Sequence, residues 1–204
     1  MKMTAKLVSY LFHPLLFTTY LVLLLGLLMP RFLLIPPSAL WKFAAFVFVI
    51  TFAFPVANIF MLKVFGSISS LEMRDREERI IPFSMITIFY GVVVFMFFYK
   101  IGNNVNFNKM MLIVAAMTMV ATGATFFFKI SVHSLAISGA AGILLPLNKV
   151  AGDGSLLWPT AILFGLAGVV MSSRLYLQTH TRGEVLYGAA AGFLVGFGGM
   201  FLLF

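Results

Sequence analysis

Long uncharged stretches alternate with short charged ones along the whole chain. Each of seven such stretches comes close to the ~20 residues that a helix needs to cross the hydrocarbon core of a bilayer. They cover residues 7–30, 43–62, 80–99, 110–128, 130–148, 154–173 and 185–204. Backbone polar groups in hydrocarbon need partners within the protein, so each stretch predicts a helix. We therefore predict an all-α, polytopic transmembrane helix bundle of about six to seven spans, folded as a single integral membrane domain over residues 1–204.

The composition excludes other classes of protein. Of the 204 residues, 62% are hydrophobic and 10% are charged, whereas a soluble domain has about 45–50% apolar and about 25% charged residues. A water-soluble globule and a disordered chain are therefore both excluded. In a membrane protein the net charge of +8 favours anionic membrane lipids, and no nucleic acid, as partners.

Seven crossings divide the connections between two sides of the membrane. The N-terminus and residues 63–79, 129–134 and 174–184 fall on one side, here called side one, which carries nine of the 14 lysines and arginines. The excess of positive charge would place side one in the cytoplasm. If the five arginines of side one serve a site, they say nothing about orientation. The remaining lysines and arginines are then nearly equal on the two sides, and the orientation of the protein in the membrane stays open. We expect the protein in the cytoplasmic (inner) membrane of a prokaryote.

The last stretch carries a glycine at every fourth position: Gly188, Gly192 and Gly196. Such a row of small residues lets another helix approach closely. The partner could be a helix of the same chain or of a second copy, which would make this face a homodimer interface. Internal packing is favoured because a bundle of seven spans has many internal contacts to make.

Polar side chains gather on side one. All three histidines, His13, His133 and His180, fall there, and ionisable groups at membrane depth usually mark a functional site. His13 alone is expected to bond a neighbouring helix. Five arginines share this side: Arg74, Arg76, Arg79, Arg174 and Arg182. Residues 72–79 are mostly charged, so this segment is either a solvated loop or a segment that folds over the site and supplies arginines to it.

The types of residue on side one indicate phosphoryl transfer. His180 and Glu184 are four residues apart, so they share one helix face, and a carboxylate on one ring nitrogen leaves the other as nucleophile or base. Ser131 and His133 open a predicted helix, whose N-terminus favours an anion. Arginine binds phosphate with two hydrogen bonds. The chain has no zinc-type histidine pair and no carboxylate cluster, so we predict a site without metal or cofactor.

Several of these residues also share the spacing of three motifs. Ser173, Arg174 and His180 fall in register with Ser-Arg-x5-His-x3-Asp, and Glu184 takes the place of the aspartate. Partial matches link Ser131 and His133 to Pro-Ser-Gly-His, and Arg79 to Lys-x6-Arg-Pro. Over roughly residues 66–192 the chain resembles the type 2 phosphatidic acid phosphatase superfamily. Two predicted spans separate each motif from the next, so all three fall on side one.

The resemblance implies a lipid phosphatase, a metal-independent hydrolase of a lipid phosphate or isoprenyl diphosphate. His180 would attack phosphorus and become a phosphohistidine, Glu184 would orient His180, and His133 would protonate the leaving group. The resemblance also implies residues that bind the phosphoryl group: Arg174 and Arg79 with Ser131 assisting, and Arg74 or Arg76 in place of the missing lysine.

Two departures from the motifs leave alternatives open. Glu72 stands where the lysine belongs, and Val132 replaces the glycine that would let the backbone approach the phosphate. The chain could therefore be a catalytically weakened or inactive lipid-binding or phosphate-binding protein of the same fold. A small transporter is a second alternative, although the polar residues gather at one side and do not extend across the membrane.

Overall fold

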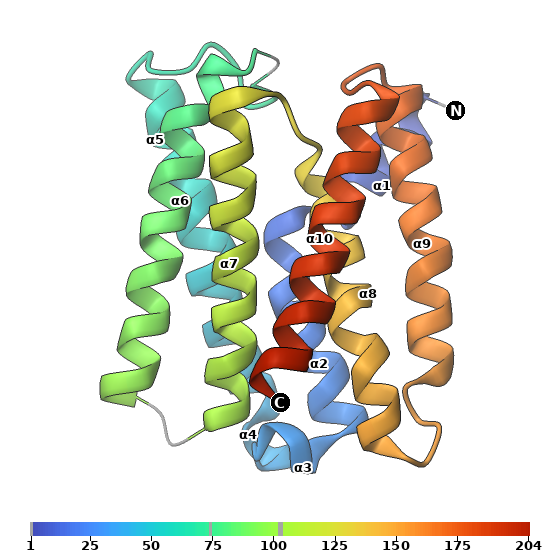
Figure 1. Cartoon of the computed structure of the whole chain (residues 1–204). Coiled ribbons are helices and arrows are strands. Elements are labelled where there is room, and N and C mark those ends of the chain that lie inside the picture. The colour runs from blue at the N-terminus through green and yellow to red at the C-terminus, as the bar shows by residue number, and fades with distance from the viewer. Residues whose placement is uncertain (1, 74, 102–103) are drawn as a thin grey trace.

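The chain folds into a bundle of helices that run up and down in turn (Figure 1). The computed structural model describes residues 2–73, 75–101 and 104–204. Seven helical segments in this part of the chain are long and apolar enough to cross a membrane, which confirms the all-α polytopic bundle. The first two spans combine several pieces: α1 (Lys2–Leu11), a 3-10 turn (Pro14–Leu16) and α2 (Phe17–Leu28), then α4 (Pro37–Phe48), a π turn (Val49–Ala53) and α5 (Phe54–Val64). The other spans are α6 (Glu77–Met96), α7 (Val105–Phe127), α8 (Val132–Ala151), α9 (Leu157–Tyr176) and α10 (Arg182–Leu203), and a short α3 (Pro30–Leu33) joins α2 to α4.

The two ends of the bundle correspond to the two predicted sides. The N-terminus and the connections α5–α6, α7–α8 and α9–α10 lie at one end (Figure 1). The C-terminus, α3 and the α8–α9 connection lie at the other. The connections that carry the candidate site residues therefore meet at one end of the molecule, because two spans separate each of them from the next.

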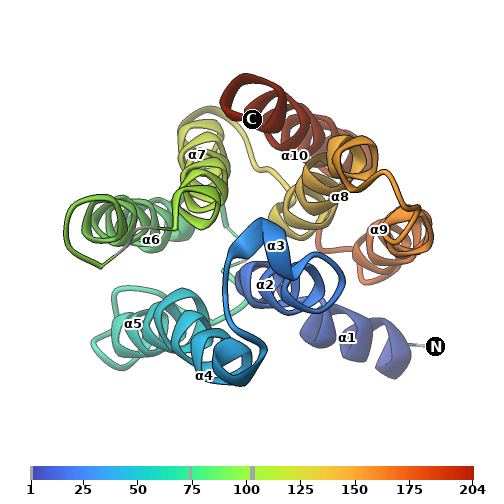
Figure 2. The same cartoon turned by 90° about the horizontal axis from the view of Figure 1, so that it is seen from below.

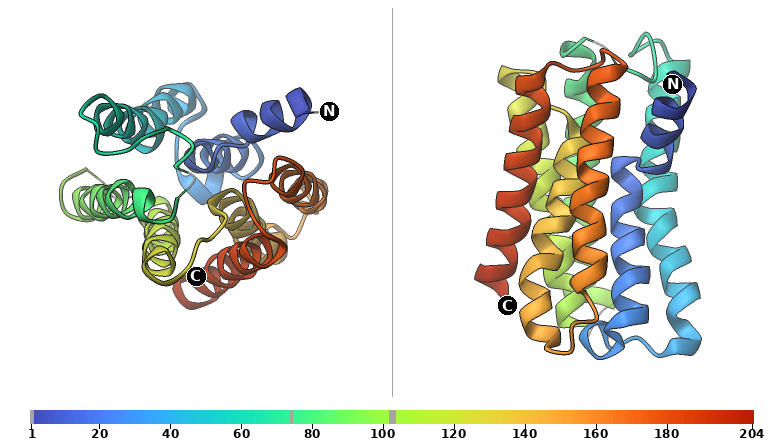
Figure 3. Two further views of the ribbon diagram at one scale, coloured as in Figure 1. Left: turned by 90° about the horizontal axis from the view of Figure 1, so that it is seen from above. Right: turned by 90° about the vertical axis from the view of Figure 1, so that its right-hand side faces the viewer.

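The first span is not one continuous helix. It breaks between α1 and the 3-10 turn at His13, whose backbone is extended with φ −65° and ψ 133°. The break follows from Pro14, because proline disfavours a helical conformation in the residue before it and has no N–H to donate. Figure 3 shows α1 inclined to the axis of α2. His13 lies about three helical turns along the chain from the start of α1.

Helix α8 lies at the centre of the bundle and is its most buried span. Seen along the bundle axis, α2, α7, α9 and α10 surround it (Figure 2). Glycine, alanine and serine are frequent along α8, because neighbouring backbones approach it closely on several sides. Its N-terminus is recessed: the chain descends from the end of α7 before α8 begins (Figure 1).

The glycine row of α10 is covered by α8 of the same chain. A Cβ atom at Gly192 or Gly196 would clash with a backbone carbonyl oxygen of α8, and one at Gly188 would clash with that of Ser131, just before α8. All three glycines are buried. The row therefore serves the internal packing that the sequence favoured, and a homodimer through this face would require α8 to move away.

This packing predicts opposite effects for two glycines of α10. Gly192→Ala should lower the thermal unfolding temperature in detergent, since the new methyl group meets the carbonyl oxygen of Leu135 and overpacking costs about 1–3 kcal/mol. The control is Gly198→Ala, where a Cβ has no neighbour within 4 Å. That variant should keep or raise the unfolding temperature, because alanine is the better helix former by up to about 1 kcal/mol. Equal unfolding temperatures for both variants would contradict the packing.

Candidate functional site

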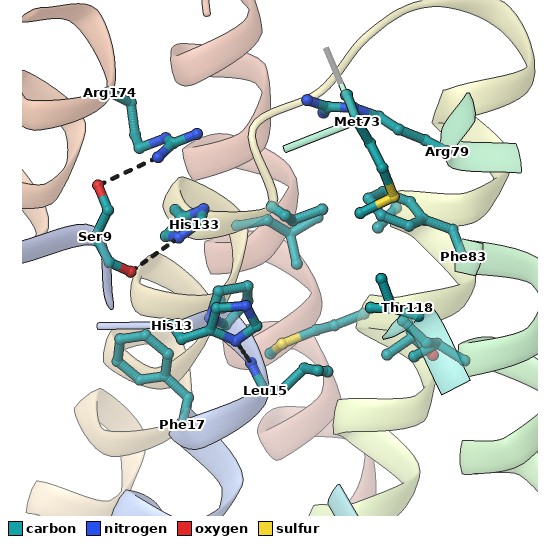
Figure 4. Close-up of a pocket in the computed structure, with 18 of the residues that line it drawn as sticks. Ser9, His13, Leu15, Phe17, Met73, Arg79, Phe83, Thr118, His133 and Arg174 are labelled. Atoms are coloured by element: carbon teal, nitrogen blue, oxygen red, sulfur yellow. Dashed lines mark hydrogen bonds between the residues drawn. The ribbon is translucent and has the colours of Figure 1, made fainter. Parts of the chain in front are cut away.

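A cavity of about 390 Å³ opens among the helix ends of side one. Its walls come from α1, α2, α6, α7, α8 and α9 and from the α9–α10 connection. Four of the predicted site residues line it together: Arg79, His133, Arg174 and His180. Figure 4 shows three of them, Arg79, His133 and Arg174, converging on the cavity from different helices. Residues distant in the sequence are thus brought to one small volume.

His133 stands in the first turn of α8 and is held through one ring nitrogen. Its Nε2 lies 3.2 Å from the carbonyl oxygen of Ser9. A carbonyl oxygen can only accept, so Nε2 carries the hydrogen. The other nitrogen, Nδ1, is buried and has no hydrogen-bond partner in the described part of the chain. His133 therefore lines the cavity with one ring nitrogen bonded to Ser9 and the other, Nδ1, left without a hydrogen bond among the described residues.

Arg174 reaches the cavity from the last turn of α9. Its Nη1 donates to the hydroxyl oxygen of Ser9 at 3.2 Å (Figure 4). Its Nε is buried without a hydrogen-bond partner among the described residues. Part of the guanidinium fork is thus occupied by Ser9, and part is available to an anion.

Arg79 lies in the first turn of α6, and its guanidinium is hydrogen-bonded to backbone carbonyl oxygens. Only 5% of its surface is exposed. Its Nε donates to the carbonyl oxygen of Met73 at 2.7 Å, and its Nη1 donates to that of Ile130 at 3.3 Å. Arg79 therefore ties the α5–α6 connection to the segment before α8, and it adds positive charge to the same cavity.

His180 and Glu184 form the closest polar contact of the site. Nδ1 of His180 lies 2.6 Å from a carboxylate oxygen of Glu184, and the imidazole side chain is 1% exposed. Burial, followed by the nearby positive charges of Arg79 and Arg174, lowers the pKa of His180 from 6.5 to about 3. The ring is thus neutral at pH 7. Since it faces a carboxylate through Nδ1, its proton lies there and Nε2 keeps a lone pair.

Three predicted site residues have other positions. Ser131 does not line the cavity; its hydroxyl caps α8 by accepting from the backbone N–H of Ser134 at 3.4 Å. Arg76 is also outside the lining, and its Nη1 donates to the carbonyl oxygen of Phe126 at 2.8 Å. Arg74 lies outside the described residues.

The first span contributes residues to the site that the motifs did not indicate. His13 and Ser9 both line the cavity. The ring centroid of His13 lies 5.8 Å from that of His133 in an edge-to-face arrangement. The sequence placed His13 on the same side of the membrane as His133, but it did not indicate that the two rings would be in contact. Lys2 and Lys6 of α1 add further positive charge to the lining.

Most of the remaining lining is apolar. Leu21, Met117, Ala140 and Ile143 contribute to it, together with a few hydroxyl groups such as that of Thr118. The cavity thus has a charged part on side one and an apolar part within the bundle. This division matches an amphiphilic ligand with an anionic head and a hydrocarbon tail. Among the described residues, no group of three or more histidine, aspartate or glutamate side chains could hold a metal ion.

The lowered pKa of His180 predicts that the fold is sensitive to acid. In the unfolded chain a histidine titrates near pH 6.5, so between about pH 6.5 and pH 3 the unfolded state binds more protons than the folded state. The contribution of His180 to the free energy of unfolding is therefore fully present above pH 6.5 and declines as the pH falls toward 3. His180→Asn should flatten the dependence of the unfolding temperature on pH in that interval. Gln178→Asn, in the same connection, should keep the slope, and equal slopes in both variants would contradict the assignment.

Comparison with known proteins adds no further indication of the chemistry. No protein-family model, no curated protein sequence and no solved structure matches the chain. The chemistry that the cavity can support therefore has to follow from its own side chains.

Proposed function

We propose that the protein is a membrane lipid phosphatase that hydrolyses a lipid phosphate or an isoprenyl diphosphate through a phosphohistidine intermediate on His180. The observation that supports this best is the composition of one cavity. Its polar part combines a carboxylate-bonded histidine with a second histidine and two arginines, and its other part is apolar. The resemblance of the three motifs to the type 2 phosphatidic acid phosphatases points the same way.

Two buried nitrogens favour an anion as the ligand. Nε of Arg174 and Nδ1 of His133 are both buried without a hydrogen-bond partner in the described chain, and both residues line the cavity. Buried polar groups are normally hydrogen-bonded. A phosphate oxygen would accept from the guanidinium, and from the imidazole when that ring is protonated. A bound phosphate would itself favour the protonated imidazole, since opposite charges stabilise each other.

The first step is transfer of the phosphoryl group to the enzyme. Nε2 of His180 attacks phosphorus with its lone pair, and the bond from phosphorus to the leaving oxygen breaks. Protonated His133 gives the hydrogen on Nδ1 to that oxygen, so an alcohol or a lipid monophosphate departs and His133 becomes neutral. Glu184 holds Nδ1 of His180 and stabilises the charge that forms on that ring. Arg174 stabilises the negative charge on the transferred group.

The second step returns the enzyme to its starting state. Water attacks phosphorus, the phosphorus–nitrogen bond breaks, and the lone pair returns to Nε2 of His180. His133, now neutral, takes a proton from the water and is ready for the next cycle. The products are inorganic phosphate and the dephosphorylated lipid. We place the reaction in the cytoplasmic membrane of a prokaryote, with the lipid tail in the apolar part of the cavity.

A second candidate is binding of a lipid phosphate without turnover. Glu72 lines the same cavity as the two arginines, and its negative charge opposes a phosphate. Val132 lines it as well, with a branched side chain close to the start of α8. Both features would weaken phosphoryl transfer more than they would weaken binding of the tail.

The nucleophile can be tested in reconstituted vesicles with a panel of lipid phosphates and diphosphates. His180→Asn should reduce phosphate release to the background rate, because no other side chain replaces the attacking nitrogen. With a substrate whose terminal phosphate is radiolabelled, the wild-type protein should carry a label that is labile in acid and stable in alkali, and His180→Asn should carry none. Gln178→Asn should release phosphate at the wild-type rate. Undiminished release by His180→Asn would refute the mechanism.

The same panel separates turnover from binding. Glu72→Gln removes the opposing charge, so it should tighten binding of a lipid phosphate by roughly two- to tenfold, as expected for one screened charge pair. Tight binding of lipid phosphate by the wild-type chain with no phosphate release from any substrate would establish the second candidate. A Glu72→Gln variant with unchanged or weaker affinity would contradict the placement of the phosphate beside Glu72.

A further inference from the structure

We propose that Ser9 is a positioning residue of the site, and that the break in the first span exists to make its carbonyl oxygen available. The inference rests on the proposed function for its kinetic readout. Ser9 belongs to none of the three motifs, and it lies 124 residues before His133 and 165 before Arg174.

Ser9 contacts two of the site residues that line the cavity, His133 and Arg174. Its hydroxyl accepts from Nη1 of Arg174 at 3.2 Å and donates to the carbonyl oxygen of Ala5 at 3.0 Å. Its carbonyl oxygen accepts from Nε2 of His133 at 3.2 Å. Ser9 is 7% exposed, and Figure 4 shows its bonds to Arg174 and His133. One residue of α1 therefore fixes a side chain of α8 and a side chain of α9.

The helix break supplies the free carbonyl. In a continuous helix the carbonyl oxygen of Ser9 would accept from the backbone N–H of His13. Here α1 ends at Leu11, and His13 has an extended backbone because Pro14 follows it. The last carbonyls of a helix have no intrahelical donor and need other partners. His133 supplies one such donor, and the hydroxyl of Tyr20 supplies another by donating to Leu11 at 2.9 Å.

The two bonds to Ser9 have separate effects on the site. The carbonyl bond keeps the hydrogen of neutral His133 on Nε2, so Nδ1 is the nitrogen that faces the ligand. The hydroxyl bond holds the guanidinium of Arg174 through Nη1, so other N–H groups of the fork, that of Nε among them, are left for the phosphate. His13, whose ring contacts that of His133, restricts the imidazole further. The carbonyl thus governs proton transfer, and the hydroxyl governs phosphate binding.

Two substitutions separate these effects. Ser9→Ala removes only the hydroxyl, so KM for the lipid phosphate should rise about fivefold, the loss expected for one hydrogen bond, with kcat nearly unchanged. Pro14→Ala supplies an N–H and permits a continuous helix, so the carbonyl gains an intrahelical donor and His133 loses its partner. That variant should lower kcat at least tenfold and leave KM within twofold. Ser9→Thr keeps the hydroxyl and should restore the wild-type KM, and Leu7→Ala, on the exposed face of α1, is the control.

A binding measurement keeps this inference distinct from the proposed function. Inorganic phosphate is titrated into vesicle-reconstituted protein, and its dissociation constant should rise about fivefold in Ser9→Ala and recover in Ser9→Thr. If the wild-type chain hydrolyses no lipid phosphate, the proposed function fails, and this titration still tests Ser9. Wild-type affinity in Ser9→Ala, or an equal loss in Ser9→Ala and Ser9→Thr, would overturn the role of the hydroxyl. Wild-type kcat in a folded Pro14→Ala variant would overturn the role of the carbonyl.

Discussion

The close contact between the backbones of α8 and α10 determines where the site can form. The backbone N–H of Ser131, just before α8, donates to the carbonyl oxygen of Glu184 in the first turn of α10 at 3.1 Å. One turn later Gly188 lies directly against the Ser131 carbonyl group, an approach that any larger residue would prevent. His133 follows this contact on α8, and His180 precedes it before α10. The glycine row and the two histidines therefore belong to one structural unit.

The sequence predicted the parts of this structure that depend on hydrophobicity and local spacing. Seven uncharged stretches became seven spans, since a bilayer-length apolar segment has no other stable conformation. His180 and Glu184 are bonded because residues four apart share a helix face. The internal role of the glycine row was also expected. These features depend on short stretches of chain, so no knowledge of tertiary contacts was needed.

Tertiary contacts decided the rest of the site. The sequence indicated Ser131 and Arg76 as ligands of a phosphate, but a serine before a helix can satisfy the helix instead, and an arginine on a connection can satisfy a nearby carbonyl. Arg79 shows the same competition, because two backbone carbonyls occupy its donors while it lines the cavity. Ser9 carried no signal at all. Part of its proposed role belongs to a carbonyl oxygen, which every residue type has, and its hydroxyl is one of many in the chain.

The recessed start of α8 has a consequence for the shape of the molecules that can reach His133. The chain descends before this helix begins, so a ligand that enters from side one must pass the neighbouring helix ends to reach the first turn of α8. In the proposed reaction this depth would favour a small terminal phosphate over a phosphorus atom that bears a bulky substituent on each side. Such a preference against phosphodiesters with large polar heads would be steric and independent of charge.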